Sequence, residues 1–134
     1  MSAPQQSIYP TLTYRDARGA VEWLTRAFGL EAAVVHEGPD GAIAHAELGF
    51  GGSRIMLGTA KPDGWGALAP PPGTGAVYVV VDDVDAHHAR ARDAGAEIVL
   101  GPTDTDYGSR DYAARDPEGN LWSFGTYRPG ADRA

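Results

Sequence analysis

His45 and Glu47 are the strongest candidates in this sequence for ligand binding or acid–base chemistry. They alternate along the strand-like segment Ala42 to Phe50, and alternation places both side chains on one face of a strand. An imidazole beside a carboxylate can hydrogen-bond a ligand or serve as an acid–base pair. A solvent-facing polar alternation without a task would leave the same pattern, and the residues alone do not choose between the two.

The hairpin around this pair enlarges the candidate set. Gly51-Gly52 is a two-residue turn signal, and such a turn places Glu47 opposite Met56. His45, Glu47, Arg54 and Met56 then share one face of the hairpin. The other face is apolar, and we expect it to pack under a helix; it comprises Ala44, Ala46, Leu48, Phe50, Ile55 and Leu57.

Aromatic side chains are the second kind of candidate, because rings stack on planar ligands. Trp65 lies in a stretch rich in Pro and Gly, where closing over a ligand and plugging the domain are equally compatible with its position. Trp23 and Trp122 are predicted to be core residues. Tyr107 and Arg110 share one predicted loop and could rim a site.

The other histidines carry weaker signals. His87 and His88 are adjacent on a predicted helix and cannot face one point, so a solvated helix face explains them. His36 comes near a strand end, before Gly38, where a surface position is expected. The glycine-rich stretches lack the spacing of a nucleotide-binding loop.

An internal repeat organises the elements that position these residues. Ile8 to Tyr14 reads as a strand, Asp16 as a helix N-cap, and the segment 17–28 as a helix that ends at Gly29. The second half repeats this order with a strand over 76–81, a cap at Asp83 and a helix that ends at Gly95. Duplication of one module explains the shared order.

Three strand-like segments follow each helix, so each half reads βαβββ. In the first half they are 32–36, 42–50 and 53–57; in the second half they are 97–100, 111–115 and 121–127. The face on which 111–115 points stays open, because a bulge at the turn Asp116-Pro117-Glu118-Gly119-Asn120 would invert it. We predict one α+β domain over 1–134, with modules at about 8–58 and 76–127 and a connector over 59–75 that forms a loop.

Composition excludes several classes of function. The chain has 134 residues, a formal net charge of −7 and a single lysine, Lys61, so a nucleic-acid phosphate backbone is an unsuitable partner. No apolar run approaches the ~20 residues of a membrane-spanning helix, and no membrane association is expected. Cysteine is absent, which fits a reducing compartment, and we expect a cytoplasmic protein.

Three segments resemble one protein family. They are YPTLTYRDARGAVEWLTRAFGLE near the start, GAIAHAELGFGGSRIMLG in the middle, and DYAARDPEGNLWSFGTY near the end. Together they resemble the vicinal oxygen chelate superfamily of glyoxalase I, bleomycin-resistance proteins and extradiol dioxygenases, in its PhnB-like or bleomycin-resistance-like branch. The resemblance implies two modules whose curved sheets form a cavity, with the helices outside and Tyr78 facing the cavity.

The resemblance also implies where metal ligands would lie in this chain. Metal-dependent members take His, Gln or Glu from the first and last strand of each module, and those positions correspond to Tyr9, Met56, Ala76 and Ser123. None of these is a usual ligand for a hard divalent ion. We therefore expect no metal and no other cofactor.

The function expected from these observations is metal-independent binding of a small molecule, with no catalytic residue assigned. The resemblance suggests an antibiotic, planar or cationic, and it implies a homodimer. The expected ligand-binding residues are Tyr9, His45, Glu47, Arg54, Met56, Trp65, Tyr78 and Ser123. The alternative is a lyase, isomerase or dioxygenase of the same superfamily with an atypical site.

Overall fold

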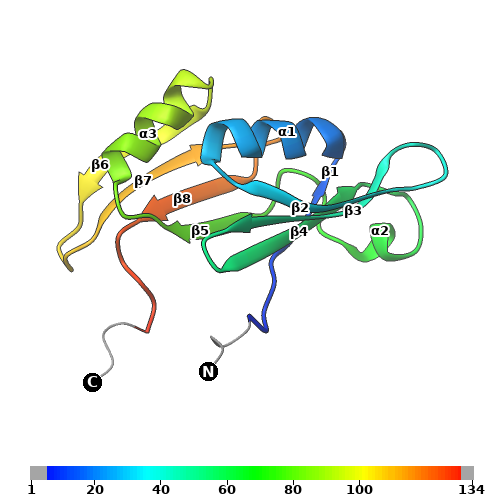
Figure 1. Ribbon diagram of the computed structural model, residues 1–134, viewed down its shortest axis with the longest axis horizontal. Helices are drawn as coiled ribbons and strands as arrows, with labels where there is room; N and C mark the ends of the chain where they lie inside the picture. The colour runs from blue at the N-terminus through cyan, green and yellow to red at the C-terminus, as the bar shows by residue number, and fades with distance from the viewer. Residues whose placement is uncertain (1–5, 131–134) are drawn as a thin grey trace. The chain divides into compact units, whose positions relative to one another are not determined.

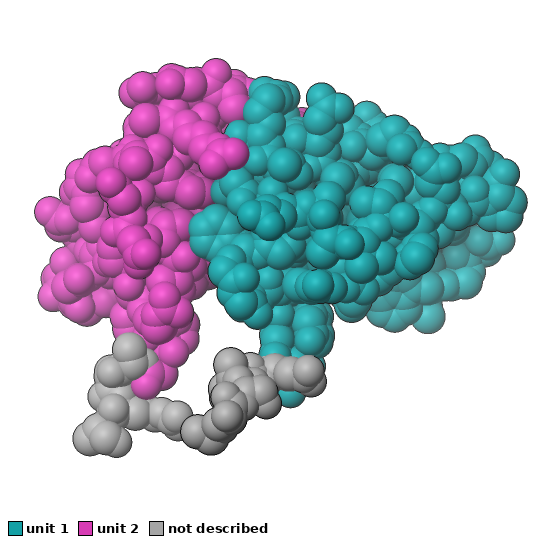
Figure 2. Space-filling model, in the orientation of Figure 1, with its two compact units in different colours: residues 1–73 teal, residues 74–134 magenta. Residues whose placement is uncertain are grey.

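The computed structural model describes residues 6–130, and the chain divides into two compact units between Gly73 and Thr74 (Figure 2). Each unit contains a strand, a helix and three further strands in that order, and each sheet has four strands. Neither sheet is closed. The predicted α+β fold of two tandem βαβββ modules is confirmed, whereas the cavity that the resemblance implies stays a prediction.

The first unit contains β1 (Thr11–Tyr14), α1 (Ala17–Phe28), β2 (Glu31–Glu37), β3 (Ile43–Phe50) and β4 (Ser53–Thr59). Its sheet has the order β1-β4-β3-β2, in which β1 runs parallel to β4 and the other pairs are antiparallel. Helix α1 covers one face of this sheet (Figure 1). The opposite face of the sheet therefore carries the candidate polar residues.

Local chemistry explains where α1 begins and ends. The Asp16 carboxylate accepts a hydrogen bond from the Gly19 amide at 3.0 Å, which satisfies a free N–H of the first turn. Gly29 ends the helix with φ of 79°, a left-handed conformation that glycine adopts without strain. Leu24 and Phe28 are fully buried against the sheet, and each stabilises the fold by roughly 1.5–3 kcal/mol.

The β3–β4 hairpin has the predicted register, with Glu47 opposite Met56 and Phe50 opposite Ser53. The predicted apolar face is buried at Ala46, Leu48, Ile55 and Leu57.

The prediction is wrong at Ala44, which is exposed, whereas its neighbour Ile43 is buried. His36 pairs with His45 but Glu37 pairs with Ile43, so Ala44 is an extra residue in a β-bulge. A bulge reverses the alternation of side chains beyond it, and hence Ile43 faces the core.

The second unit contains β5 (Ala76–Val80), α3 (Val84–Asp93), β6 (Glu97–Asp104), β7 (Arg110–Arg115) and β8 (Leu121–Gly125), and its sheet has the order β5-β8-β7-β6. Strand β6 extends beyond the predicted end at Leu100, and β8 ends before the predicted Tyr127. Helix α3 packs on β6 and β7. The core beneath it includes Tyr112, Trp122 and Phe124, all fully buried, which confirms the core position predicted for Trp122.

The connector contains a one-turn helix, α2 (Trp65–Leu68), where the composition predicts only a loop. Gly66 allows this turn to form, because a side chain there would collide with the backbone carbonyl of Lys61. Four helical residues are too few to produce a helical periodicity, and the surrounding Pro and Gly residues favour the prediction of a loop.

The turn 116–120 is held together by one buried carboxylate. Asp116 accepts hydrogen bonds from the Glu118 and Asn120 amides, from the Asn120 side chain and from Trp122 Nε1, at 3.0 to 3.1 Å. The ladder between β7 and β8 then runs without a register shift. This motif of the family resemblance is therefore structural in this protein.

Regular pairing settles the orientation of β7. Tyr112 and Ala114 are buried beneath α3, so Asp111, Ala113 and Arg115 belong to the opposite face of the sheet. Across the described residues, no helix is both long and apolar enough to cross a membrane.

Candidate functional site

A hydrogen-bonded triad occupies the open face of the first unit. His45 Nε2 lies 2.9 Å from Glu47 Oε2, and Arg54 Nη1 donates to Glu47 Oε1 at 2.7 Å. The three side chains are between 27% and 47% exposed, so water and a ligand can both reach them. The structure thus brings together the predicted residues His45, Glu47 and Arg54.

These contacts stabilise the charged form of Glu47. The hydrogen bond from His45, and next the hydrogen bond from Arg54, lower the pKa of the Glu47 carboxyl below its ordinary value, against a smaller opposing effect of burial. Glu47 is therefore ionised at neutral pH. A lowered pKa makes it a weaker general base and suits it to holding a partner by charge.

Gln6 connects this triad to the segment before β1, and the sequence gives no signal for it. The Arg54 amide donates to Gln6 Oε1 at 2.6 Å, and Gln6 Nε2 donates back to the Arg54 carbonyl at 3.0 Å. The Tyr9 hydroxyl donates to the Gln6 carbonyl at 2.8 Å. Tyr9, 40% exposed, is thereby held beside the strand that carries Arg54 and Met56.

His36 is a further residue that sequence reasoning leaves out of the site. It is exposed, as predicted, but β2 pairs it directly with His45, and the two rings stack with centroids 6.3 Å apart. The signal that could find it is the register between β2 and β3, which the bulge at Ala44 conceals.

Trp65 lies on α2 and is 68% exposed. Its predicted closure over a ligand stays a prediction. Trp23 is half-buried and makes an edge-to-face contact with Phe28, with the ring centroids 4.9 Å apart.

Tyr78 and Ser123 are direct neighbours on the open face of the second unit, the face opposite α3, because β5 pairs with β8 and places Tyr78 beside Ser123. The Tyr78 hydroxyl donates to the Tyr127 carbonyl at 2.5 Å. Burial, and next the negative charge of Asp111, raise the pKa of Tyr78 above its ordinary value. The phenol therefore stays neutral and remains a hydrogen-bond donor.

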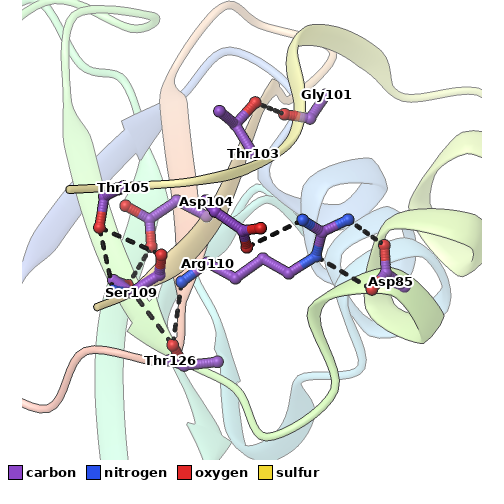
Figure 3. A network of polar contacts seen from close by, with 9 residues as sticks. Asp85, Gly101, Thr103, Asp104, Thr105, Ser109, Arg110 and Thr126 are labelled. Carbon is purple, nitrogen blue, oxygen red and sulfur yellow. Dashed lines mark hydrogen bonds and ion pairs between the residues drawn. The ribbon is translucent and has the colours of Figure 1, made fainter. Parts of the chain in front are cut away.

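Arg110 lies on β7, where two carboxylates hold its side chain, and its place at the rim of a site stays a prediction. Its guanidinium forms ion pairs with Asp85 on α3 at 2.9 Å and with Asp104 on β6 at 3.0 Å (Figure 3). Both carboxylates raise the pKa of Arg110, so the group stays charged. The side chain thus links α3 to strands β6 and β7 through two ion pairs.

The family model for the "Glyoxalase/Bleomycin resistance protein/Dioxygenase superfamily" matches residues 8–124. The chain belongs to this superfamily. Among solved structures, TioX from Micromonospora sp. ML1 is 34% identical, with a TM-score of 0.75 over 91% of this chain and 100% of TioX. An integron cassette protein from Vibrio cholerae, 23% identical with a TM-score of 0.69 over 95% of this chain and all of that one, shows the shared fold alone.

One curated relative is similar to most of this chain. An uncharacterized protein of Mycobacterium tuberculosis (strain H37Rv) is 33% identical over 126 residues, which cover 90% of this chain and 74% of the relative.

The metal that the superfamily resemblance implies does not fit the residues at its positions. Tyr9 and Met56 in the first unit, and Ala76 and Ser123 in the second, offer a phenol, a thioether, a methyl group and a hydroxyl. Hard divalent ions prefer carboxylate and imidazole ligands. Within residues 6–130, no group of three or more His, Cys, Asp or Glu side chains is arranged to hold an ion.

Proposed function

We propose that this member of the superfamily is a metal-independent small-molecule binding protein. The observation that carries the proposal is the residue set Tyr9, Met56, Ala76 and Ser123 at the positions where the superfamily resemblance places metal ligands. Binding without a metal needs hydrogen-bonding and aromatic groups on an accessible face, and each unit has such groups. The triad of His45, Glu47 and Arg54 supplies them in the first unit, and Tyr78 supplies them in the second.

The ligand that these groups suit is a planar or cationic antibiotic, which the protein would sequester stoichiometrically and so confer resistance. Glu47 is ionised and half-buried on an accessible face, and a formal net charge of −7 favours the approach of a cation. We place this activity in the cytoplasm, in keeping with the absence of cysteine, and we propose that the protein acts as a homodimer.

A thermal-shift screen against planar and cationic antibiotics tests the proposal, because a ligand that binds the folded state raises Tm by mass action. Calorimetric titration of each hit should give the same stoichiometry and the same affinity before and after dialysis of the protein against a chelator. Glu47→Gln should weaken binding of cationic hits, whereas Glu22→Gln, the same change on the exposed surface of α1, should not. A hit that binds only with added Zn²⁺, Ni²⁺, Mn²⁺ or Fe²⁺ would contradict the proposal.

One observation favours a second function, that of a lyase, isomerase or dioxygenase with an atypical site. Glu47 holds the His45 ring at 2.9 Å, as the carboxylate of an acid–base dyad would. Under this function His45→Gln would abolish turnover and leave substrate affinity within a few-fold of the original. Incubation of a hit with stoichiometric protein, followed by mass spectrometry, separates capture from turnover.

A further inference from the structure

Asp111 lies on the open face of the second unit among hydroxyl groups. Its Oδ1 accepts a hydrogen bond from Ser109 Oγ at 2.5 Å, and its Oδ2 faces the Tyr107 hydroxyl at 3.4 Å. Both donors are neutral hydroxyl groups. Their hydrogen bonds therefore orient the carboxylate without neutralising its negative charge.

Gly125 provides the space for this arrangement. It pairs with Asp111 across β7 and β8, and a Cβ there would collide with Asp111 Oδ1 and come within 2.8 Å of the Tyr78 hydroxyl. The absence of a side chain lets the carboxylate and the phenol approach one another over the strand.

No ion pair within residues 6–130 includes Asp111. The cation next to it in the sequence, Arg110, extends to the opposite face and is taken by Asp85 and Asp104 (Figure 3). A half-buried carboxylate with only neutral donors attracts a cation from solution, because a charge-assisted hydrogen bond is stronger than a neutral one.

Tyr107 and Tyr78 lie near this carboxylate, and Tyr127 contacts both of these tyrosines. Tyr107 and Tyr127 meet edge to face with ring centroids 5.9 Å apart, and the Tyr78 hydroxyl bonds the Tyr127 backbone. Tyr107 is 64% exposed, and Tyr78 and Tyr127 are about two-fifths exposed, so their rings are accessible. Electron-rich ring faces bind ammonium and guanidinium groups, and the effect adds to that of a nearby carboxylate.

We propose that Asp111, Tyr78, Tyr107 and Tyr127 form a subsite for an organic cation, of the substituted-ammonium class. This inference rests on the proposed function. It specifies that the ligand is positively charged and which residues bind the positive charge. Asp111 supplies the counter-charge, the tyrosine rings supply cation–π contacts, and Gly125 keeps the carboxylate accessible. The raised pKa of Tyr78 supports this assignment, because a neutral phenol beside Asp111 adds no second negative charge.

The probe for this subsite is choline, compared with its neutral isostere 3,3-dimethylbutan-1-ol in amide-detected NMR titrations. Choline should shift the amides of 107–111 and 125–127, and the neutral alcohol should bind at least about tenfold more weakly. Equal binding of the two probes, or shifts elsewhere only, would overturn the proposal.

Substitutions identify the groups responsible. Asp111→Asn should weaken choline binding at least about tenfold, since a charge-assisted contact is lost. Asp82→Asn, the same change at an exposed position before α3, should leave binding unchanged. Tyr107→Leu should weaken binding several-fold, whereas Tyr107→Phe, which keeps the ring, should retain most of it. Equal choline affinity for Asp111→Asn and the original protein would overturn the proposal.

Tyr127→Leu keeps the test decisive if Asp111→Asn fails to fold, because the hydrogen bonds of Tyr127 to Ser109 and Tyr78 run through its backbone. Loss of choline affinity in this variant supports the subsite, and unchanged affinity overturns it. Antibiotics separate this proposal from the proposed function. If Asp111→Asn leaves the affinity for cationic antibiotics unchanged, the subsite alone is refuted. If the protein binds choline but no antibiotic, the proposed function alone is refuted.

Discussion

Glu47 on β3 accepts a hydrogen bond from Arg54 on β4 at 2.7 Å, although the residue directly opposite Arg54 is Gly49. The contact runs diagonally across the hairpin. Gly49 has no side chain to obstruct it, and the other oxygen of Glu47 meets His45. The charged triad on the open face of the first unit therefore depends on three local features of the sequence. These are the Gly51-Gly52 turn, the alternation of His45 and Glu47 along β3, and the small residue Gly49.

The contacts of Glu47 with His45 and Arg54 should make folding stability depend on pH in a defined direction. Because the folded-state pKa of Glu47 lies below its ordinary value of 4.5, these contacts stabilise the fold above that pH, and their contribution is lost as pH falls through the lowered pKa. Urea denaturation of the original protein and Glu47→Gln should differ at pH 7 and converge toward pH 3. A constant difference over that range would show that the carboxylate charge is not involved.

Asp116→Asn should be severely destabilising, by about 2–4 kcal/mol, because it leaves buried donors without an acceptor. Asp116 is 4% exposed and accepts four hydrogen bonds. Denaturation midpoints by circular dichroism measure the effect. Asp106→Asn, in the exposed loop before β7, is the matched control and should remain within about 0.5 kcal/mol of the original. Similar midpoints for the two variants would contradict a structural role for the turn.

The hairpin that carries the triad was predictable from sequence because its signals are local. Gly51-Gly52 sets the turn, and the alternation of Glu47 with apolar neighbours sets the register. The bulge at Ala44 was not predictable, since it arises from the pairing of β3 with β2, which lies earlier in the chain. The stacking of His36 on His45 depends on that same pairing.

The contacts that the sequence conceals are those between segments distant in the chain. Gln6 bonds Arg54 through its amide, and nothing in the local pattern marks a glutamine before a strand as a site residue. The orientation of Asp111 depended on whether the turn after β7 adds a bulge. The hydrogen bonds of Asp116 close that turn without one, which directs Asp111 to the face of Tyr78 and Ser123.

The proposed homodimer can be tested at an edge strand. Strand β6 ends its sheet, and Val99 and Leu100 on it are 44% and 51% exposed, so the edge offers unpaired backbone groups beside apolar side chains. Sedimentation equilibrium should give twice the chain mass for the original protein and a monomer for Leu100→Lys. Leu68→Lys, at an exposed leucine on α2, is the control and should remain dimeric. A monomeric original protein at micromolar concentration would refute the assembly.

Metal removal should leave the protein unchanged. The residues at the ligand positions offer no carboxylate or imidazole, so exhaustive dialysis against a chelator should alter neither Tm nor ligand affinity. Elemental analysis of the purified protein should find less than stoichiometric Zn, Ni, Mn and Fe. A metal that survives dialysis at one equivalent per chain, and whose loss lowers Tm, would overturn the metal-independent assignment.

Trp65 should report ligand capture by its fluorescence. Because it is 68% exposed, its substitution should change Tm little, whereas the half-buried Trp23 packs against Phe28 and should be insensitive to ligand. A planar ligand stacked on Trp65 should quench or shift the emission, and Trp65→Phe should remove most of that change while Trp23→Phe preserves it. Trp65→Ala should weaken binding by about 0.5–1.5 kcal/mol beyond the loss of buried area, measured by calorimetry. If an antibiotic binds tightly and both the emission change and the affinity survive Trp65→Ala, the ring does not cover the ligand, and the binding face must be sought on the strands alone.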